Sequence, residues 1–206
     1  MLETDRAEEV LEETDMAFLF AQKYHSAMKN VGPVRKEMGE RTIFNILGPL
    51  TNPANASRQL LGVYDKELVE KLAEVLANLG VTRGMSVCGG DGLDEITVTG
   101  PTYCCEIKDG ELTSYEIIPE QFGLSTYPLA ELVGGTPEEN AQITKDILSG
   151  TLKGAKRDVV LMNAGIGIYL GSENLTMEGG IKKAEELINS GKAYEKMEEF
   201  VKATQQ

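Results

Sequence analysis

The sequence is poor in the residues that build disulfide or zinc-bound frameworks. Its 206 residues include no tryptophan, one histidine and three cysteines. Cys104 and Cys105 are adjacent, and Cys88 stands apart from them. An odd number of cysteines without CxxC spacing argues against both a disulfide framework and a cysteine metal site. Free cysteines are typical of a reducing compartment, so we expect a cytoplasmic protein.

Positive charge and long apolar runs are also scarce. The 20 Lys and Arg residues face 33 Asp and Glu, which gives a net charge of -13. A general nucleic-acid binder needs cations that displace phosphate counterions, so we expect no nucleic-acid partner. No apolar run reaches the ~18–20 residues of a membrane span, and the acidic N-terminus is unlike a signal peptide. We therefore expect no membrane partner, whereas a local basic pocket leaves room for a small anionic ligand.

The length and the apolar pattern fit a single α/β domain over residues 1–206. Residues 60–64 and 84–87 have the pattern of buried strands, and 66–79 between them carries a helical stripe of apolar residues. This order indicates a right-handed βαβ unit within a mostly parallel central sheet that is flanked by helices.

Other stretches extend this prediction. Residues 96–99, 103–107 and 112–118 predict strands of an antiparallel excursion, and the apolar run 158–163 predicts a further buried strand. The segment 41–54 contains Gly-Pro and Asn-Pro dipeptides, which indicate a shaped loop. Helices are predicted over 1–15, much of 22–39, 136–148, a stretch opening at 164–167, 176–190 and a last segment to about 202.

An acidic loop, residues 89–95, follows the second strand. It places Asp91, Asp94 and Glu95 among three glycines. Glycine lets the backbone turn sharply and approach a ligand, and ligands of open α/β sheets bind at the carboxyl ends of strands. Carboxylates at such a place suit Mg²⁺ bridged to a substrate phosphate. The alternative is a tight turn whose acids cap a neighbouring helix or face water.

The segment from Lys29 to Arg41 is the most basic part of the chain. Within it, the planar guanidinium of Arg35 matches a carboxylate or a phosphate through two hydrogen bonds. The sole histidine, His25, lies at the start of the same segment. The alternative interpretation is that the basic side chains are solvated and that the histidine is packed or solvated.

From about Ala7 to Val201 these motifs resemble the anthranilate phosphoribosyltransferase family. That family transfers phosphoribose from phosphoribosyl pyrophosphate (PRPP) to the amine of anthranilate, releases pyrophosphate, requires Mg²⁺ and serves tryptophan biosynthesis. The resemblance implies a C-terminal domain of the nucleoside phosphorylase/phosphoribosyltransferase type. Its signatures are Phe18–Ala21, His25–Lys29, Pro33–Arg35, Arg41–Pro53, Asp91–Glu95, Gly134-Gly135 with Glu139–Ala141, and Asn163-Ala164.

The resemblance also implies roles for individual residues. Asp94 and Glu95 are similar to the pair that holds the Mg²⁺ on the pyrophosphate, and Arg35 to the arginine that meets the anthranilate carboxylate. Because Mg²⁺ neutralises the leaving group, no catalytic protein nucleophile is implied, and the sequence offers no Ser/His/Asp or Cys/His set. The implied walls of the anthranilate channel are His25, Pro49, Met28 and Asn45.

The family's full chain is longer and contains parts that this sequence lacks. They are a helical dimerisation domain, a Gly-Thr-Gly-Gly-Asp phosphate loop and a Lys-His-Gly-Asn segment. We therefore expect a fragment that is incomplete as a stand-alone catalyst, that exposes apolar surface and that has an N-terminal fragment or a homo-oligomer as its partner. The alternative is a non-catalytic scaffold or association fragment of the same family.

Two related classes are disfavoured. The motif over residues 25–35, which resembles the anthranilate side of the site, argues against a pyrimidine-nucleoside phosphorylase. The net charge of -13 argues against a nucleic-acid-binding relative.

Overall fold

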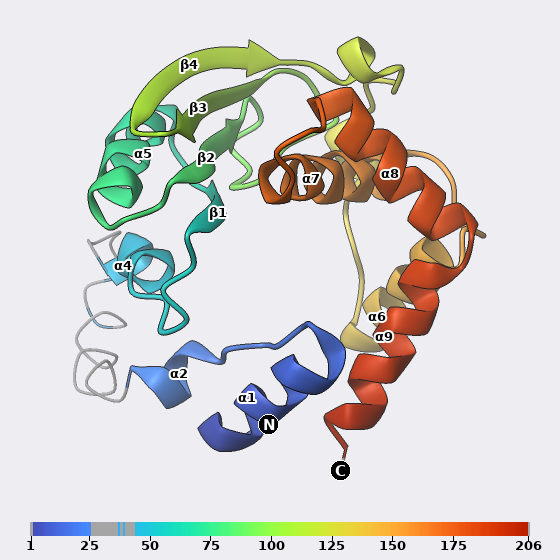
Figure 1. The fold of residues 1–206 in the computed structure, drawn as a ribbon. Helices are drawn as coiled ribbons and strands as arrows, with labels where there is room; N and C mark the ends of the chain where they lie inside the picture. The colour runs from blue at the N-terminus through green and yellow to red at the C-terminus, as the bar shows by residue number, and fades with distance from the viewer. Residues whose placement is uncertain (1, 26–36, 38, 40–43, 206) are drawn as a thin grey trace. The chain divides into compact units, whose positions relative to one another are not determined.

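A computed structural model describes residues 2–25, 37, 39 and 44–205 (Figure 1). The chain divides into two compact units. The end unit combines residues 1–55 with 193–206, and the sheet unit is the continuous segment 56–192. The expectation of a single domain over residues 1–206 stays a prediction.

The sheet unit is built on a four-stranded mixed sheet in the order β1-β2-β3-β4. β1 (Arg58–Gly62) pairs in parallel with β2 (Arg83–Gly89), and β3 (Thr102–Lys108) and β4 (Glu111–Ile117) follow in antiparallel pairing. A short 3₁₀ helix, η2 (Lys66–Leu68), and α5 (Val69–Asn78) connect β1 to β2. The predicted α/β class, the strand–helix–strand order and the antiparallel excursion are thereby confirmed.

Helices cover both faces of this sheet. Met85 and Val87 of β2 belong to a buried cluster with Met162 of α7 (Ala155–Gly171), so α7 covers their face. On the opposite face the hydroxyl of Ser114 donates to a carboxylate oxygen of Glu70 in α5, at 2.7 Å. Cys104 lies on the α7 face and Cys105 on the α5 face, and both thiols are buried. Both are core residues.

The remaining elements of the sheet unit follow β4 in the chain. The side-chain oxygen of Thr136 accepts the N–H of Glu139, which confirms the predicted start of the helix at 136–148. Gly180 lies close against Gly165, because a Cβ added to Gly180 would be 2.2 Å from the Gly165 carbonyl oxygen. These elements are η3 (Pro119–Phe122), η4 (Leu129–Glu131), α6 (Pro137–Leu148) and α8 (Met177–Asn189).

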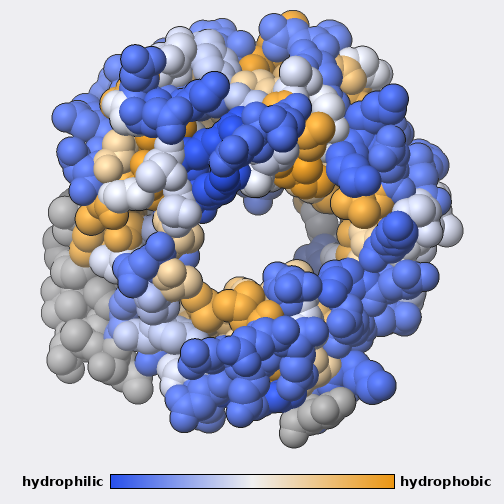
Figure 2. All heavy atoms as spheres, viewed as in Figure 1, coloured by the Kyte–Doolittle hydropathy of each residue, from blue (hydrophilic) through white to orange (hydrophobic). Residues whose placement is uncertain are grey.

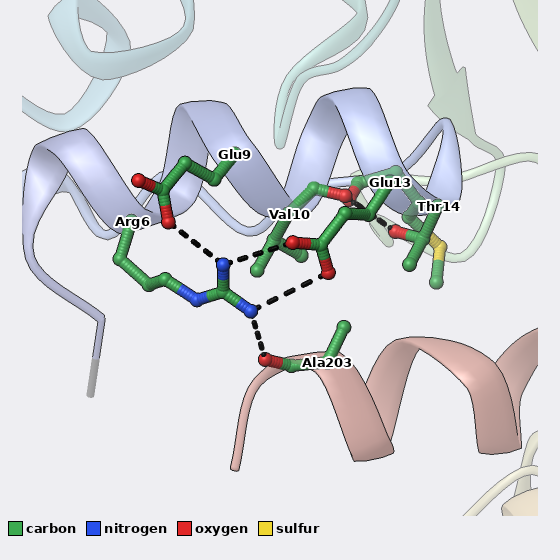
Figure 3. A network of polar contacts seen from close by, with 7 residues as sticks. Arg6, Glu9, Val10, Glu13, Thr14 and Ala203 are labelled. Atoms are coloured by element: carbon green, nitrogen blue, oxygen red, sulfur yellow. Dashed lines mark hydrogen bonds and ion pairs between the residues drawn. The ribbon is translucent and has the colours of Figure 1, made fainter. Parts of the chain in front are cut away.

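The end unit joins helices from both ends of the chain. They are α1 (Thr4–Thr14), α2 (Ala21–Tyr24), α4 (Phe44–Leu50) and α9 (Lys192–Ala203), whose first residue still belongs to the sheet unit. Arg6 of α1 donates to Glu9 at 2.7 Å, to Glu13 at 3.0 Å and to the carbonyl of Ala203 at 2.9 Å (Figure 3). A single guanidinium thus links α1 to the last turn of α9.

Apolar side chains also lie at the surface of the end unit. Figure 2 shows them gathered over the segment that joins α1 to α2. In this segment Phe18 is 66% exposed, and its ring centroid lies 6.2 Å from that of Phe20. Among the residues that the structure describes, no helix combines the length and the apolar character that a membrane crossing requires.

The strand predicted at 158–163 is wrong, because this run lies inside α7. α7 contributes Met162 to the buried cluster on one side and packs through Gly165 against α8 on the other. The helix is therefore apolar around much of its circumference. A helix buried in this way shows the same short apolar run as a buried strand. The helix predicted to open at 164–167 is the second half of the same element.

The strand predicted at 96–99 is also wrong, although Ile96 and Val98 are both fully buried. Their backbone groups bond to Asn163 and to the N–H of Tyr127 instead of to a neighbouring strand. The alternating apolar pattern of residues 96–99 therefore predicted correctly that Ile96 and Val98 are buried. It predicted incorrectly that the segment pairs with a neighbouring strand.

The loop predicted over 41–54 contains α4. Pro49 lies in the last turn of α4, where its missing N–H removes only one helical bond. The hydroxyl of Thr51 then donates to the carbonyl of Leu47 at 2.9 Å, and the helix ends. The helix predicted over much of 22–39 lies largely outside the described residues.

Candidate functional site

The acidic loop leaves the sheet at the carboxyl end of β2 and turns back on itself. The N–H of Gly89 donates to the carbonyl of Leu93 at 2.8 Å, and the N–H of Gly92 donates to that of Gly89 at 2.9 Å. Gly92 has φ of 85°, a conformation that glycine adopts without strain. The N–H of Gly90 donates to the carbonyl of Pro101 at 2.7 Å, which closes the loop.

Asp91 holds this loop together from within. Its Oδ1 accepts the N–H of Leu93 at 3.1 Å, and its Oδ2 accepts the hydroxyls of Thr97 at 2.6 Å and Thr99 at 2.5 Å. Burial alone would raise the pKa of Asp91, but these hydrogen bonds outweigh it and bring the pKa below its usual value. Asp91 is therefore a charged anchor of the turn.

Asp94 and Glu95 are both exposed, and they lie between two fixed points of the backbone. A Cβ added to Gly62 of β1 would be 1.6 Å from the carbonyl oxygen of Asp94, so only glycine fits beneath the loop. After Glu95, the N–H of Ile96 donates to Oδ1 of Asn163 at 3.0 Å, and Nδ2 of Asn163 donates to the carbonyl of Ile96 at 2.7 Å. The two carboxylates are thus presented to solvent by a backbone that is fixed on both sides.

A cavity of about 530 Å³ adjoins the two carboxylates. Lys156 contributes a positive charge to its lining, and its Nζ donates to the carbonyl of Glu131 at 2.5 Å. The apolar part of the lining is Leu93, Leu129, Leu132, Val133, Ile143, Ile147 and Val159. The lining therefore combines two carboxylates and one ammonium group with an apolar wall.

The donor set fits a hard cation that is shared with a ligand. Over residues 2–25, 37, 39 and 44–205, no group of three or more His, Cys, Asp or Glu side chains is arranged to hold a metal. Mg²⁺ commonly takes one or two protein carboxylates and completes its shell with water and substrate phosphates. The exposed pair Asp94 and Glu95 matches this requirement, and a closed protein cage would not.

The cysteines at the site are not activated nucleophiles. Cys88 lies just before the acidic loop, where burial, followed by the negative charges of Asp65, Asp91 and Asp94, raises the pKa of its thiol. Burial likewise raises the pKa of Cys104 to about 12. A neutral thiol is a poor nucleophile, so neither of these two cysteines is suited to attack a substrate.

The residues implied for anthranilate binding belong to the end unit. His25 follows α2, and its Nε2 lies 3.3 Å from the hydroxyl oxygen of Thr51, next to the end of α4. Pro49 is exposed in α4, and Asn45 lies in the same helix with its side chain outside the described atoms. Arg35 and Met28 lie outside the described residues, so these roles stay predictions.

Three residues that hold the acidic loop were not identified from the sequence. Thr97 and Thr99 lie in the run that we interpreted as a strand, although two threonines soon after a glycine-rich acidic turn are suited to hydrogen-bond the turn's carboxylate. Asn163 belongs to a signature of the resemblance but had no role assigned. Its position on α7 is distant in sequence from the loop, so only the fold reveals the contact.

Comparison with known proteins finds a family model and relatives that match almost the whole chain. A family model described as "Glycosyl transferase family, a/b domain" matches residues 1–194. The anthranilate phosphoribosyltransferase of Endomicrobium trichonymphae is 52% identical over 204 residues, which is 99% of this chain and 60% of that protein.

Solved structures of anthranilate phosphoribosyltransferases are also similar to this chain. The crystal structure of anthranilate phosphoribosyltransferase from Thermus thermophilus matches with a TM-score of 0.90 and 41% identity, over 98% of this chain and 59% of that one. The Saccharomyces cerevisiae enzyme "in complex with PRPP and Mg" matches with a TM-score of 0.89 and 32% identity, over 98% and 58%. The chain therefore spans about 60% of the length of the curated relative and slightly less of these two structures.

Proposed function

Because this chain belongs to the glycosyl transferase family through its a/b domain, we propose that it carries the metal–pyrophosphate side of an anthranilate phosphoribosyltransferase. The reaction moves phosphoribose from PRPP to the amine of anthranilate and releases pyrophosphate. One observation supports the proposal above the others. Asp94 and Glu95 are exposed on a loop whose backbone is fixed on both sides, at the carboxyl end of a central strand.

In this proposal Asp94 and Glu95 hold the magnesium ion against the pyrophosphate of PRPP. Mg²⁺, when bound, neutralises the charge that develops on the leaving pyrophosphate. The protein fixes the backbone on both sides of the two carboxylates, and the described cysteines Cys88 and Cys104 offer no competing nucleophile. The Saccharomyces cerevisiae enzyme, which has a similar fold and was solved in complex with PRPP and Mg, supports this assignment.

The roles that we propose in anthranilate binding come from the resemblance of the sequence to the anthranilate phosphoribosyltransferase family. Arg35 would bind the anthranilate carboxylate through its two-pronged guanidinium. His25, Pro49, Met28 and Asn45 would form the walls around the ring. The contact between His25 and Thr51 next to α4 supports a shared surface for His25 and Pro49, since Thr51 follows Pro49 by two residues. We also infer a cytoplasmic location from three cysteines that are free and buried.

The metal assignment is tested by removing both carboxylates. Isothermal calorimetry would measure how PRPP binds with and without Mg²⁺ to the parent and to the double variant Asp94→Ala, Glu95→Ala. We expect the Mg²⁺-dependent part of the binding to disappear in this variant. The control is Glu8→Ala, Glu12→Ala, which removes the same charge from the exposed face of α1. Equal binding by the parent and the Asp94, Glu95 variant would disprove the assignment.

Turnover is tested with PRPP, Mg²⁺ and anthranilate by following the loss of anthranilate fluorescence. The chain is assayed alone and together with the segment of a relative that the match leaves out. Activity only in the mixture would support a transferase that needs a partner segment. Silence in both, with the chain shown to be folded, would favour the non-catalytic scaffold. Arg35→Ala should weaken anthranilate binding more than Arg35→Lys, which keeps the charge but loses the planar fork.

A further inference from the structure

Asn163 makes a contact with the acidic loop that resembles a strand pairing. Its Oδ1 accepts the N–H of Ile96 at 3.0 Å, and its Nδ2 donates to the carbonyl of Ile96 at 2.7 Å. The second N–H of the same amide donates to the carbonyl of Val159 at 2.9 Å, one turn back along α7. Carbonyl oxygens only accept, so only one orientation of the amide makes all three bonds.

This contact replaces the strand neighbour that Ile96 lacks. Ile96 is fully buried, and buried backbone groups without partners are costly. An amide presents one donor and one acceptor side by side, as a backbone segment does, and can satisfy both groups of a single residue. Asn163 is half-buried in the middle of α7, whose packing against β1 and β2 fixes its position.

The position of the contact matters because Ile96 directly follows Glu95. The backbone before the carboxylates is limited by Gly62, where a Cβ would meet the Asp94 carbonyl at 1.6 Å. Asn163 limits the backbone after them. Without it, the N–H and the carbonyl of Ile96, the residue next to Glu95, would both lose their hydrogen bonds, and the two carboxylates would sample several orientations.

We propose that Asn163 is a positioning residue for the metal–pyrophosphate site, which orients Asp94 and Glu95 by fixing the backbone of Ile96. The inference rests on the proposed function, because it requires Asp94 and Glu95 to hold the cation. In this role Asn163 bonds to the protein backbone and not to the ligand. It acts through the loop, in the manner of the outer-shell groups that orient metal ligands in other proteins.

The test compares Asn163→Ala and Asn163→Asp with the parent. Asn163→Asp keeps the shape but replaces the donor to Ile96 and Val159 with a second acceptor. The control is Asn174→Ala, an exposed asparagine after α7. Mn²⁺ serves as a spectroscopic substitute for Mg²⁺, and its binding with pyrophosphate is measured by electron paramagnetic resonance. Thermal unfolding sets a temperature at which every variant is folded.

We expect both Asn163 variants to bind Mn²⁺–pyrophosphate about 10–100-fold more weakly than the parent, the usual range for loss of an outer-shell partner. The Mn²⁺ spectrum of the remaining complex should broaden, because the carboxylates take several arrangements. A merely structural residue would lower the unfolding temperature and leave the affinity and spectrum of the folded protein unchanged. That outcome would overturn the inference.

The experiment also separates this inference from the function on which it depends. If the parent binds Mn²⁺–pyrophosphate no better than the Asp94→Ala, Glu95→Ala variant, the proposed metal site fails and the inference fails with it. If the parent depends on Asp94 and Glu95 but tolerates Asn163→Asp, the function stands and the role of Asn163 is wrong.

Discussion

At the scale of single residues, the three carboxylates of the acidic loop divide into two kinds. Asp91 is surrounded by three donors and keeps its charge through them. Asp94 and Glu95 are exposed and free to meet a ligand. Asp91 therefore has a structural role within its own turn, whereas the metal-binding role of Asp94 and Glu95 stays a prediction.

The low pKa of Asp91 predicts a dependence of stability on pH. Its folded-state pKa is below the ordinary value of 3.8, so the unfolded chain binds more protons between the two values. The stability that Asp91 contributes is present above pH ~3.8 and is lost as the pH falls through the folded-state pKa. Asp91→Asn should lower the free energy of unfolding at pH 7 by about 1–3 kcal/mol.

Urea unfolding from pH 7 to pH 2, followed by circular dichroism, checks this prediction. The difference between the parent and Asp91→Asn should shrink as the medium becomes more acidic. Glu111→Gln, an exposed site on β4, is the control. A difference that is constant with pH would mean that the charge of Asp91 does not stabilise the loop.

Gly62 gives a second prediction at the residue scale. Gly62→Ala would drive a methyl group into the Asp94 carbonyl and displace the acidic loop. We expect a loss of about 3 kcal/mol in the free energy of unfolding together with weaker Mg²⁺-dependent binding of PRPP. Gly100→Ala is the matched control, since Gly100 follows the same loop and has no atom within 4 Å of its added Cβ. Equal stability of the two variants would contradict the close approach.

At the scale of elements, α7 does the most to organise the sheet unit. It covers one face of the sheet, holds the acidic loop through Asn163 and packs against α8 through glycines. The approach of the two helices requires both Gly165 and Gly180, because a Cβ on either would overlap with the other helix. Small residues at a crossing allow backbones to come this close.

Gly180→Ala should separate α7 from α8. The new Cβ would lie 2.2 Å from the Gly165 carbonyl oxygen, and we expect a loss of about 2–3 kcal/mol in the free energy of unfolding. Gly167→Ala is the control, because Gly167 lies in α7 with open space around it. That change should be neutral or stabilise the helix by up to about 1 kcal/mol. Denaturant unfolding of both variants measures the difference, and similar losses would refute the packing argument.

The elements also show how far the sequence predicts the fold. Periodicity and capping residues correctly located the four strands of the described sheet, because these strands have clear ends, and five helices that each have one apolar face: α1, α5, α6, α8 and α9. α7 was missed over 158–163 because it is buried on more than one side, which removes the helical period. Residues 96–99 were misassigned because the side chains of Asn163 and Thr102 and the backbone N–H of Tyr127, and no neighbouring strand, bond to their backbone groups.

For the candidate site, too, the sequence points only to residues whose signal is local in the chain. Asp94 and Glu95 could be proposed as metal ligands from the sequence because they are adjacent and belong to a recognisable motif, and this role stays a prediction. No role could be proposed for Asn163, because its contact with Ile96 spans 67 residues and leaves no periodic signal. Information of this kind becomes visible only when the fold brings the two segments together.

At the scale of the whole molecule, the end unit depends on contacts between distant parts of the chain. Arg6 bridges Glu9 and Glu13 within α1 and reaches the carbonyl of Ala203 at the end of α9 (Figure 3). Arg6→Gln should therefore loosen the last turn of α9, and amide hydrogen exchange there should rise about two- to fivefold, since exposed ion pairs contribute little.

Mass-spectrometric hydrogen exchange of the C-terminal peptide measures this effect. Lys202→Gln, an exposed change in the same helical turn, is the control. Amides of β2 and β3 should exchange as in the parent. Unchanged exchange at the end of α9 would mean that other contacts hold the helix in place.

The division of the chain into two units also sets an order of events during translation. The sheet unit is continuous, so its sheet and core can form once residues 56–192 have left the ribosome. The end unit must wait for α9, which follows the sheet unit in the chain. During this interval α1 remains without its partner, and the crowded negative charge of residues 1–15 disfavours association with other nascent chains.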